Sequence, residues 1–172
     1  VVALLAANGR RLWTDSLSRA GRINSLSAIN DIAGRPVIDG GAAYAASHSG
    51  LLAAIDLRSG QRIWARTFAS TQTPWVAGDV LYAVNVDGEL AAFDRRTGNV
   101  YWVAQLRRYR DEDQRKGRVA WTGPIMIGGR LVLANSEGDV VAVSPANGQT
   151  LATSDVGQPV YIPPIAANEQ VY

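Results

Sequence analysis

The sequence predicts an all-β chain that forms part of a β-propeller with four-stranded antiparallel blades. Residues 53–64 read AAIDLRSGQRIW and residues 91–102 read AAFDRRTGNVYW, so an Asp, a Gly and a Trp recur at one spacing. A repeat of this kind indicates that one structural unit is used more than once. Short runs rich in Val, Leu, Ala and Tyr between glycines are typical of strands joined by turns.

A wider pattern fixes the length of the repeated unit. A Pro is followed four residues later by a turn residue, usually Gly, and eight residues later by an apolar residue. The copies of this pattern are Pro36, Gly40 and Tyr44; Pro74, Gly78 and Tyr82; Pro124, Gly128 and Val132; Pro164, Asn168 and Tyr172. Units of roughly 40 residues with four strands each match a propeller blade. Paired helices are the alternative for such a period, but the glycine spacing leaves no room for a helix of about ten residues.

The clearest unit places its four strands, which we name A to D, at 75–77, 80–86, 89–94 and 99–106. The expected division of the chain is a half blade at 1–14, blades at 36–66, 74–106 and 124–156, a half blade at 163–172, and long interblade loops at 15–35 and 107–123. This is a partial ring of about four blades. We expect a fragment of a larger ring, or half of an assembly, because a propeller protects its sheet edges by closing.

The repeated motif predicts a device that docks neighbouring blades. Its Asp and its Ser or Thr can hydrogen-bond the backbone of a turn, and its Gly takes the left-handed position there. The Trp then lies on the outer strand, where its ring packs against the neighbouring blade. The residues assigned to this role are Asp56, Gly60, Trp64, Asp94, Gly98 and Trp102. Diverged copies carry Leu5 in place of Asp, and Ser144 and Ala152 in place of Asp and Trp.

Composition and charge argue against several functions. The formal net charge of +2 is too small for a nucleic-acid surface, and no apolar run approaches the roughly 20 residues that cross a bilayer. There is no cysteine and His48 is the one histidine, so the sequence predicts no metal site, no cofactor and no catalytic residue. A quinone-dependent dehydrogenase would need Ca²⁺ held by carboxylate and amide oxygens, and an aspartate base. The acidic residues at 111–113 lie in a charged run instead.

The tandem AxDxxTGxxxW motifs resemble those of the quinoprotein-like superfamily of eight-bladed propellers. The segments GRINSLSAINDIAGRPVIDG, LLAAIDLRSGQRIW and TGPIMIGGRLVLANSEGDV are similar, more narrowly, to the C-terminal part of the BamB family of lipoproteins. This resemblance implies a non-enzymatic scaffold at the periplasmic face of the outer membrane of a Gram-negative bacterium. Its implied partners are the POTRA domains of BamA and unfolded outer-membrane proteins, with membrane attachment only through a lipid anchor upstream of this chain. The alternative is a quinone-dependent dehydrogenase or another ligand-binding propeller.

The two long loops are the candidate partner sites, because long loops on a rigid scaffold usually carry function. In the resembled family, acidic residues after a Leu-Ser pair contribute to the BamA contact. Here Leu26-Ser27 is followed by Ala28, and the next polar positions are Asn30 and Asp31, so this sequence departs from the family pattern. The predicted partner-binding residues are Arg22, Ile23, Leu26, Ile29, Asn30 and Asp31. The charged run at 107–118 is expected to be a solvated loop on the same side of the ring as His48.

Overall fold

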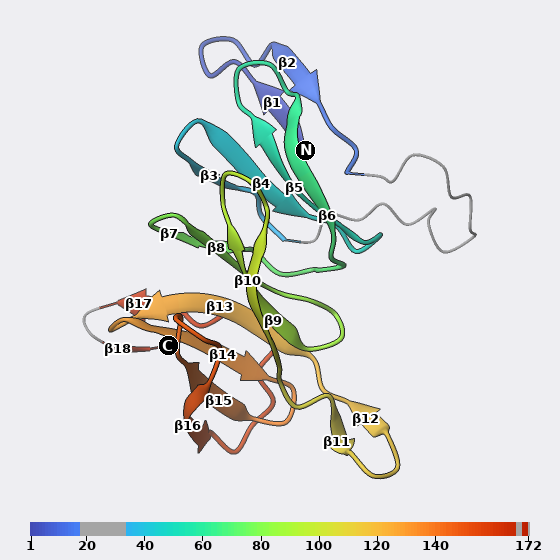
Figure 1. Cartoon of the computed structure of the whole chain (residues 1–172), viewed down its shortest axis with the longest axis vertical. Helices are drawn as coiled ribbons and strands as arrows, with labels where there is room; N and C mark the ends of the chain where they lie inside the picture. The colour runs from blue at the N-terminus through green and yellow to red at the C-terminus, as the bar shows by residue number, and fades with distance from the viewer. Residues whose placement is uncertain (18–33, 168–169, 172) are drawn as a thin grey trace.

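The computed structural model describes residues 1–17, 34–167 and 170–171, and it confirms an all-β fold made of several four-stranded antiparallel sheets (Figure 1). Blade I consists of β3 (Val37–Asp39), β4 (Ala42–Ala46), β5 (Leu51–Asp56) and β6 (Arg62–Thr67). Blade II consists of β7 (Trp75–Ala77), β8 (Val80–Val84), β9 (Glu89–Asp94) and β10 (Val100–Gln105). Blade III consists of β13 (Trp121–Ile127), β14 (Arg130–Asn135), β15 (Asp139–Val143) and β16 (Thr150–Asp155).

Two-stranded pairs complete the described part of the chain. They are the N-terminal pair β1 (Val2–Leu4) and β2 (Arg11–Thr14), the hairpin β11 (Tyr109–Asp111) and β12 (Lys116–Arg118), and the C-terminal pair β17 (Ala166–Ala167) and β18 (Gln170–Val171). Within each blade, neighbouring strands in the sequence are neighbours in the sheet, so each blade is a simple meander. No helix in the described ranges is long and apolar enough to cross a membrane.

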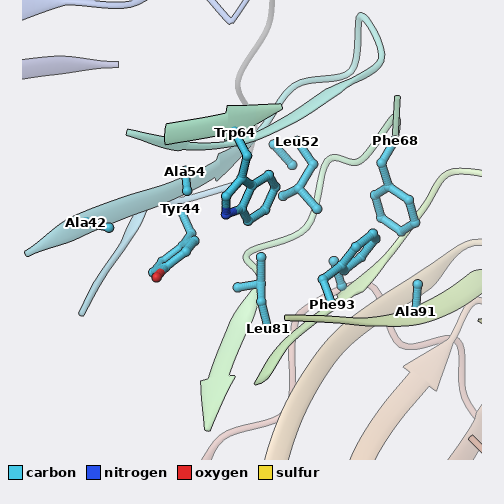
Figure 2. Close-up of a cluster of buried hydrophobic side chains, with 11 residues drawn as sticks. Ala42, Tyr44, Leu52, Ala54, Trp64, Phe68, Leu81, Ala91 and Phe93 are labelled. Carbon is cyan, nitrogen blue, oxygen red and sulfur yellow. The ribbon is translucent and has the colours of Figure 1, made fainter. Parts of the chain in front are cut away.

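The hydrophobic core lies between the blades, because successive side chains of a strand point to opposite faces of its sheet. On β4, Tyr44 faces blade II while Ala45 faces the N-terminal pair. Figure 2 shows Tyr44 and Trp64 of blade I beside Leu81 of blade II. The rings of Phe68 and Phe93 meet edge to face, with their centroids 5.4 Å apart. Each blade is therefore stabilised by its neighbours.

The turn between the two outer strands of a blade is organised by an Asp. The Asp94 Oδ1 atom accepts backbone N–H bonds from Arg96 and Thr97, at 2.9 and 2.8 Å. The hydroxyl of Tyr101 donates to Asp94 Oδ2 at 2.8 Å. These hydrogen bonds, with the one from Tyr101 the strongest, lower the pKa of Asp94 to about 2. Asp56 holds the equivalent turn of blade I, where hydrogen bonds from Ser59 lower its pKa.

Each motif Trp reaches forward to the next blade. The indole N–H of Trp64 donates to the carbonyl of Arg95 at 2.9 Å, and its ring covers Gly98, where a Cβ would lie 2.6 Å from the Trp64 Cδ2 atom. The equivalent pairs are Trp13 with Leu57 and Gly60, and Trp102 with Pro145 and Gly148. The Gly of one motif therefore accommodates the Trp of the preceding unit, not its own. Only Gly fits there, since the φ of Gly98 is +69° as well.

The segment 107–123 differs from the expected long loop. It contains the hairpin β11–β12, and β13 begins at Trp121 instead of Pro124. The alternation of charges concealed these strands, since Arg, Asp and Lys are poor strand formers in isolation. The Trp121 indole N–H donates to the carbonyl of Arg107 at 2.8 Å, which ties the start of β13 to the start of the connection.

Candidate partner-binding face

The turns between strands B and C and the connections between blades lie on one side of the described part. Three equivalent backbone hydrogen bonds join them: Phe68 N to Gly50 O at 3.0 Å, Leu106 N to Gly88 O at 2.9 Å, and Val156 N to Gly138 O at 2.9 Å. A chain leaving the outer strand therefore passes beside the B–C turn of its own blade. We name this side the connection face; it includes His48, which is exposed in the B–C turn of blade I.

The first long connection begins at Asp15 and Leu17, which are held in place on this face; we name these two residues the root of the connection. Leu17 is completely buried and has a left-handed φ of 49°. Its N–H donates to Asp15 Oδ1 at 2.7 Å, and its carbonyl accepts the hydroxyl of Ser47 at 3.1 Å. A left-handed conformation is unfavourable for Leu, but burial against Ala45 and Ile55 of blade I offsets that cost. Leu17 is therefore held firmly against blade I.

An ion pair holds the same root to blade I. Arg62 of β6 donates to both carboxylate oxygens of Asp15, each at 2.7 Å. The hydrogen bond from Arg62 keeps the pKa of Asp15 below its ordinary value. A two-point Arg–carboxylate contact fixes orientation as well as distance. The root is therefore positioned by both packing and charge.

The other end of this connection is anchored on the link between blades I and II. The Arg35 N–H donates to Thr73 Oγ1 at 3.0 Å. At Gly34 any Cβ would overlap the backbone carbonyl of Gln72, so the two chain segments approach as closely as glycine allows. The predicted partner-binding residues Arg22, Ile23, Leu26, Ile29, Asn30 and Asp31 lie between these two anchors and outside the described residues. They stay a prediction.

The second long connection is the hairpin β11–β12, and ion pairs attach it to two blades. Asp87 lies in the B–C turn of blade II. Its Oδ1 atom is 2.7 Å from Arg108 Nη2, and it also forms an ion pair with Arg118. These contacts, with that to Arg118 the stronger, lower the pKa of Asp87. On blade III the pairs are Arg107 with Asp139 at 3.3 Å and Arg110 with Glu137 at 3.2 Å. Its basic side chains thus connect neighbouring B–C turns.

Sequence reasoning missed a repeated residue of this face. Four positions after each docking Trp stands an apolar side chain that is buried against the next blade. These residues are Leu17, Phe68 and Leu106. The spacing from the Trp would have revealed them. The ion pairs of Asp15 and Asp87 left no such signal, because their partners lie far away in the sequence.

A hollow of about 540 Å³ lies beside β7, β13 and the segment 161–165, and it is the place to look for an enzyme's cofactor. It is lined by Trp75, Pro124, Tyr161 and Ile162 among others, and its charged lining side chain in the described ranges is Arg35. No carboxylate contributes to that lining.

Comparison with known proteins gives the family. A family model described as Outer membrane protein assembly factor BamB matches residues 1–104, more than half of the chain. The chain belongs to the BamB family. A BamB from Alkalilimnicola ehrlichii is 29% identical over 183 residues, which cover 100% of this chain and 43% of that protein. This chain thus spans less than half of that BamB.

Solved structures agree with the BamB assignment. The crystal structure of BamB from Moraxella catarrhalis superposes with a TM-score of 0.79 at 25% identity, over 93% of this chain and 45% of that one. A quinohemoprotein alcohol dehydrogenase from Comamonas testosteroni matches with a TM-score of 0.60 at 21% identity, over 73% of this chain and 21% of that one. The second likeness shows a shared propeller fold and nothing about chemistry. The resemblance to BamB inferred from the sequence is confirmed.

Proposed function

We propose that this chain is part of a non-enzymatic scaffold of outer-membrane protein assembly, facing the periplasm at the outer membrane. In this proposal it binds the POTRA domains of BamA and assists the delivery of unfolded outer-membrane proteins. Membership of the BamB family is the observation that carries the proposal.

The connection between β2 and β3 is the proposed BamA contact. Its two ends are fixed, Leu17 against blade I and Gly34 against the link between blades I and II. Apolar anchors beside polar groups are typical of small recognition patches. In this connection Ile23, Leu26 and Ile29 are the anchors, and Asn30 and Asp31 are the polar groups.

The test is a double substitution, Leu26→Ala with Asp31→Ala, in the full-length protein. Calorimetric titration with purified POTRA domains should show a loss of about 2–4 kcal/mol in binding free energy if either residue is a hot spot. The thermal unfolding midpoint should stay that of the parent protein. A matched control, Arg115→Ala with Lys116→Ala in the hairpin, should change the salt dependence of association more than affinity.

Two results would reject this site. Unchanged affinity of the double variant would move the BamA contact elsewhere on the propeller. A large fall in its unfolding midpoint would show that Leu26 or Asp31 belongs to the core.

A further inference from the structure

The outer edge of blade II differs from the other outer edges in the described part. The outermost strands are β2, β6, β10 and β16, and each except β10 contains a charged residue. On β6 the guanidinium of Arg66 donates to the carbonyls of Gly98 and Thr97, at 2.7 and 2.9 Å. Charged residues protect sheet edges against pairing with another strand. β10, with the sequence VYWVAQ, lacks this protection.

The apolar side chains of β10 are open to solvent. Val100, Tyr101 and Val103 are 51%, 56% and 55% exposed. Isolated exposed apolar residues are ordinary, but β10 carries three of them and no charged residue.

The backbone of β10 also offers unused hydrogen-bonding groups. In its pairing with β9, Leu106 N donates to Gly88 O at 2.9 Å, and Ala104 and Val103 lie opposite Leu90 and Ala91. Antiparallel pairs alternate between bonded and non-bonded positions. The N–H and C=O groups of Val103 therefore point to the open side. In the described part of the chain no strand lies there, since β10 ends its sheet.

A hollow of about 430 Å³ lies beside the start of this strand. Tyr101, Trp102 and Tyr82 line it together with Pro145 of the next blade. The Pro145 carbonyl already accepts the Trp102 indole N–H at 3.0 Å and the Tyr82 hydroxyl at 3.3 Å, so the polar groups of these rings are satisfied. An apolar or aromatic side chain from a neighbouring strand fits such a place.

We propose that the open edge of β10 binds an extended, uncharged segment of an unfolded outer-membrane protein by adding it to blade II as a fifth strand. Main-chain groups of an extended partner pair with the edge, while its side chains contact Val100 and Val103 on one face of the sheet and the hollow on the other. The strands of membrane β-barrels have this chemistry, since they alternate apolar residues over about 9–11 positions. This inference rests on the proposed function and names a surface for its client chains, separate from the BamA contact.

The test uses the full-length protein and a fluorescein-labelled ten-residue peptide that alternates Val or Tyr with Thr. Fluorescence anisotropy should show saturable binding. A peptide of the same sequence with every backbone amide N-methylated should fail to bind, because neither of its edges can donate to β10. Val103→Pro removes the outward N–H without breaking a bond to β9, and it should weaken binding at least tenfold. Val103→Thr, which keeps the N–H and the branched side chain, should bind as the parent does.

A second pair of variants covers the case in which the proline variant does not fold. Val103→Lys places a charge on the edge and should also weaken binding tenfold, while Ile63→Lys on β6 should leave it unchanged. Normal binding by a folded Val103→Pro or by Val103→Lys overturns the proposal. So does a concentration-dependent dimer that Val103→Lys disrupts, since β10 would then pair with a second copy. POTRA binding, measured on the same variants, should be retained; its absence in the parent protein would reject the BamA contact and leave the peptide result standing.

Discussion

Replacing Trp64 by Ala tests the docking of blades most directly. The Trp64 side chain is 7% exposed, its ring centroid is 6.3 Å from that of Tyr44, and its N–H is bonded to Arg95. Truncating a buried Trp costs about 3–5 kcal/mol. In a chain of this size that lowers the thermal midpoint by roughly 6–20 °C. Urea unfolding, followed by circular dichroism, should give the same loss of free energy, and Trp64→Phe should lose less because most of the ring packing remains.

A double-mutant cycle with Gly98 locates the cost at the interface between blades. Gly98→Ala alone should destabilise, because its Cβ would lie 2.6 Å from the Trp64 ring and its φ of +69° disfavours Ala. In the Trp64→Ala background the steric part should disappear and only the backbone part remain. Simple additivity of the two changes would refute the contact, and an unchanged midpoint for Trp64→Ala would refute the docking role itself.

Three further outcomes follow from named contacts. Hydrogen bonds from Tyr101 and from the turn lower the pKa of Asp94 from 3.8 to about 2. The ionised Asp94 therefore stabilises the fold fully above about pH 4, and this stabilisation is lost as the pH falls toward 2. Asp94→Asn should remove that part of the acid dependence of the free energy of unfolding, measured with urea. Asp87→Asn should release the hairpin, so that trypsin cleaves after Arg115 faster. The free energy of unfolding should change by no more than about 1 kcal/mol. Leu17→Ala should cost about 2–5 kcal/mol, measured by denaturant unfolding.

The blade architecture could be predicted because its determinants are local. Gly98 and Asp94 lie within one turn, and their spacing to Trp102 repeats along the chain. A turn needs particular residues at particular positions, so the sequence records it directly. The direction of docking left no local trace, since Trp64 meets Gly98 only after two blades have formed.

The connection face was harder to predict for the same reason. The hairpin β11–β12 has strand residues of low strand propensity, and Asp87 and Glu137 hold it from turns in two different blades. Such pairs depend on the tertiary structure, so a charged run by itself suggests only solvation. Leu17 was overlooked because its burial depends on the next blade, although its distance from Trp13 repeats in Phe68.

Each motif Trp docks on the following blade. The motif of blade III can therefore lose its own Trp and still keep Gly148, which receives Trp102 of blade II. Gly148 and the carbonyl of Pro145 serve the interface with blade II, because they receive the ring and the N–H of Trp102. Ser144 replaces the motif Asp, yet the turn keeps its backbone bond from Gly148 N to Ser144 O at 2.9 Å. Ala152 stands at the Trp position, which serves the other face of the blade. The turn that receives a Trp and the strand that supplies one therefore belong to different interfaces, and either can vary without disturbing the other.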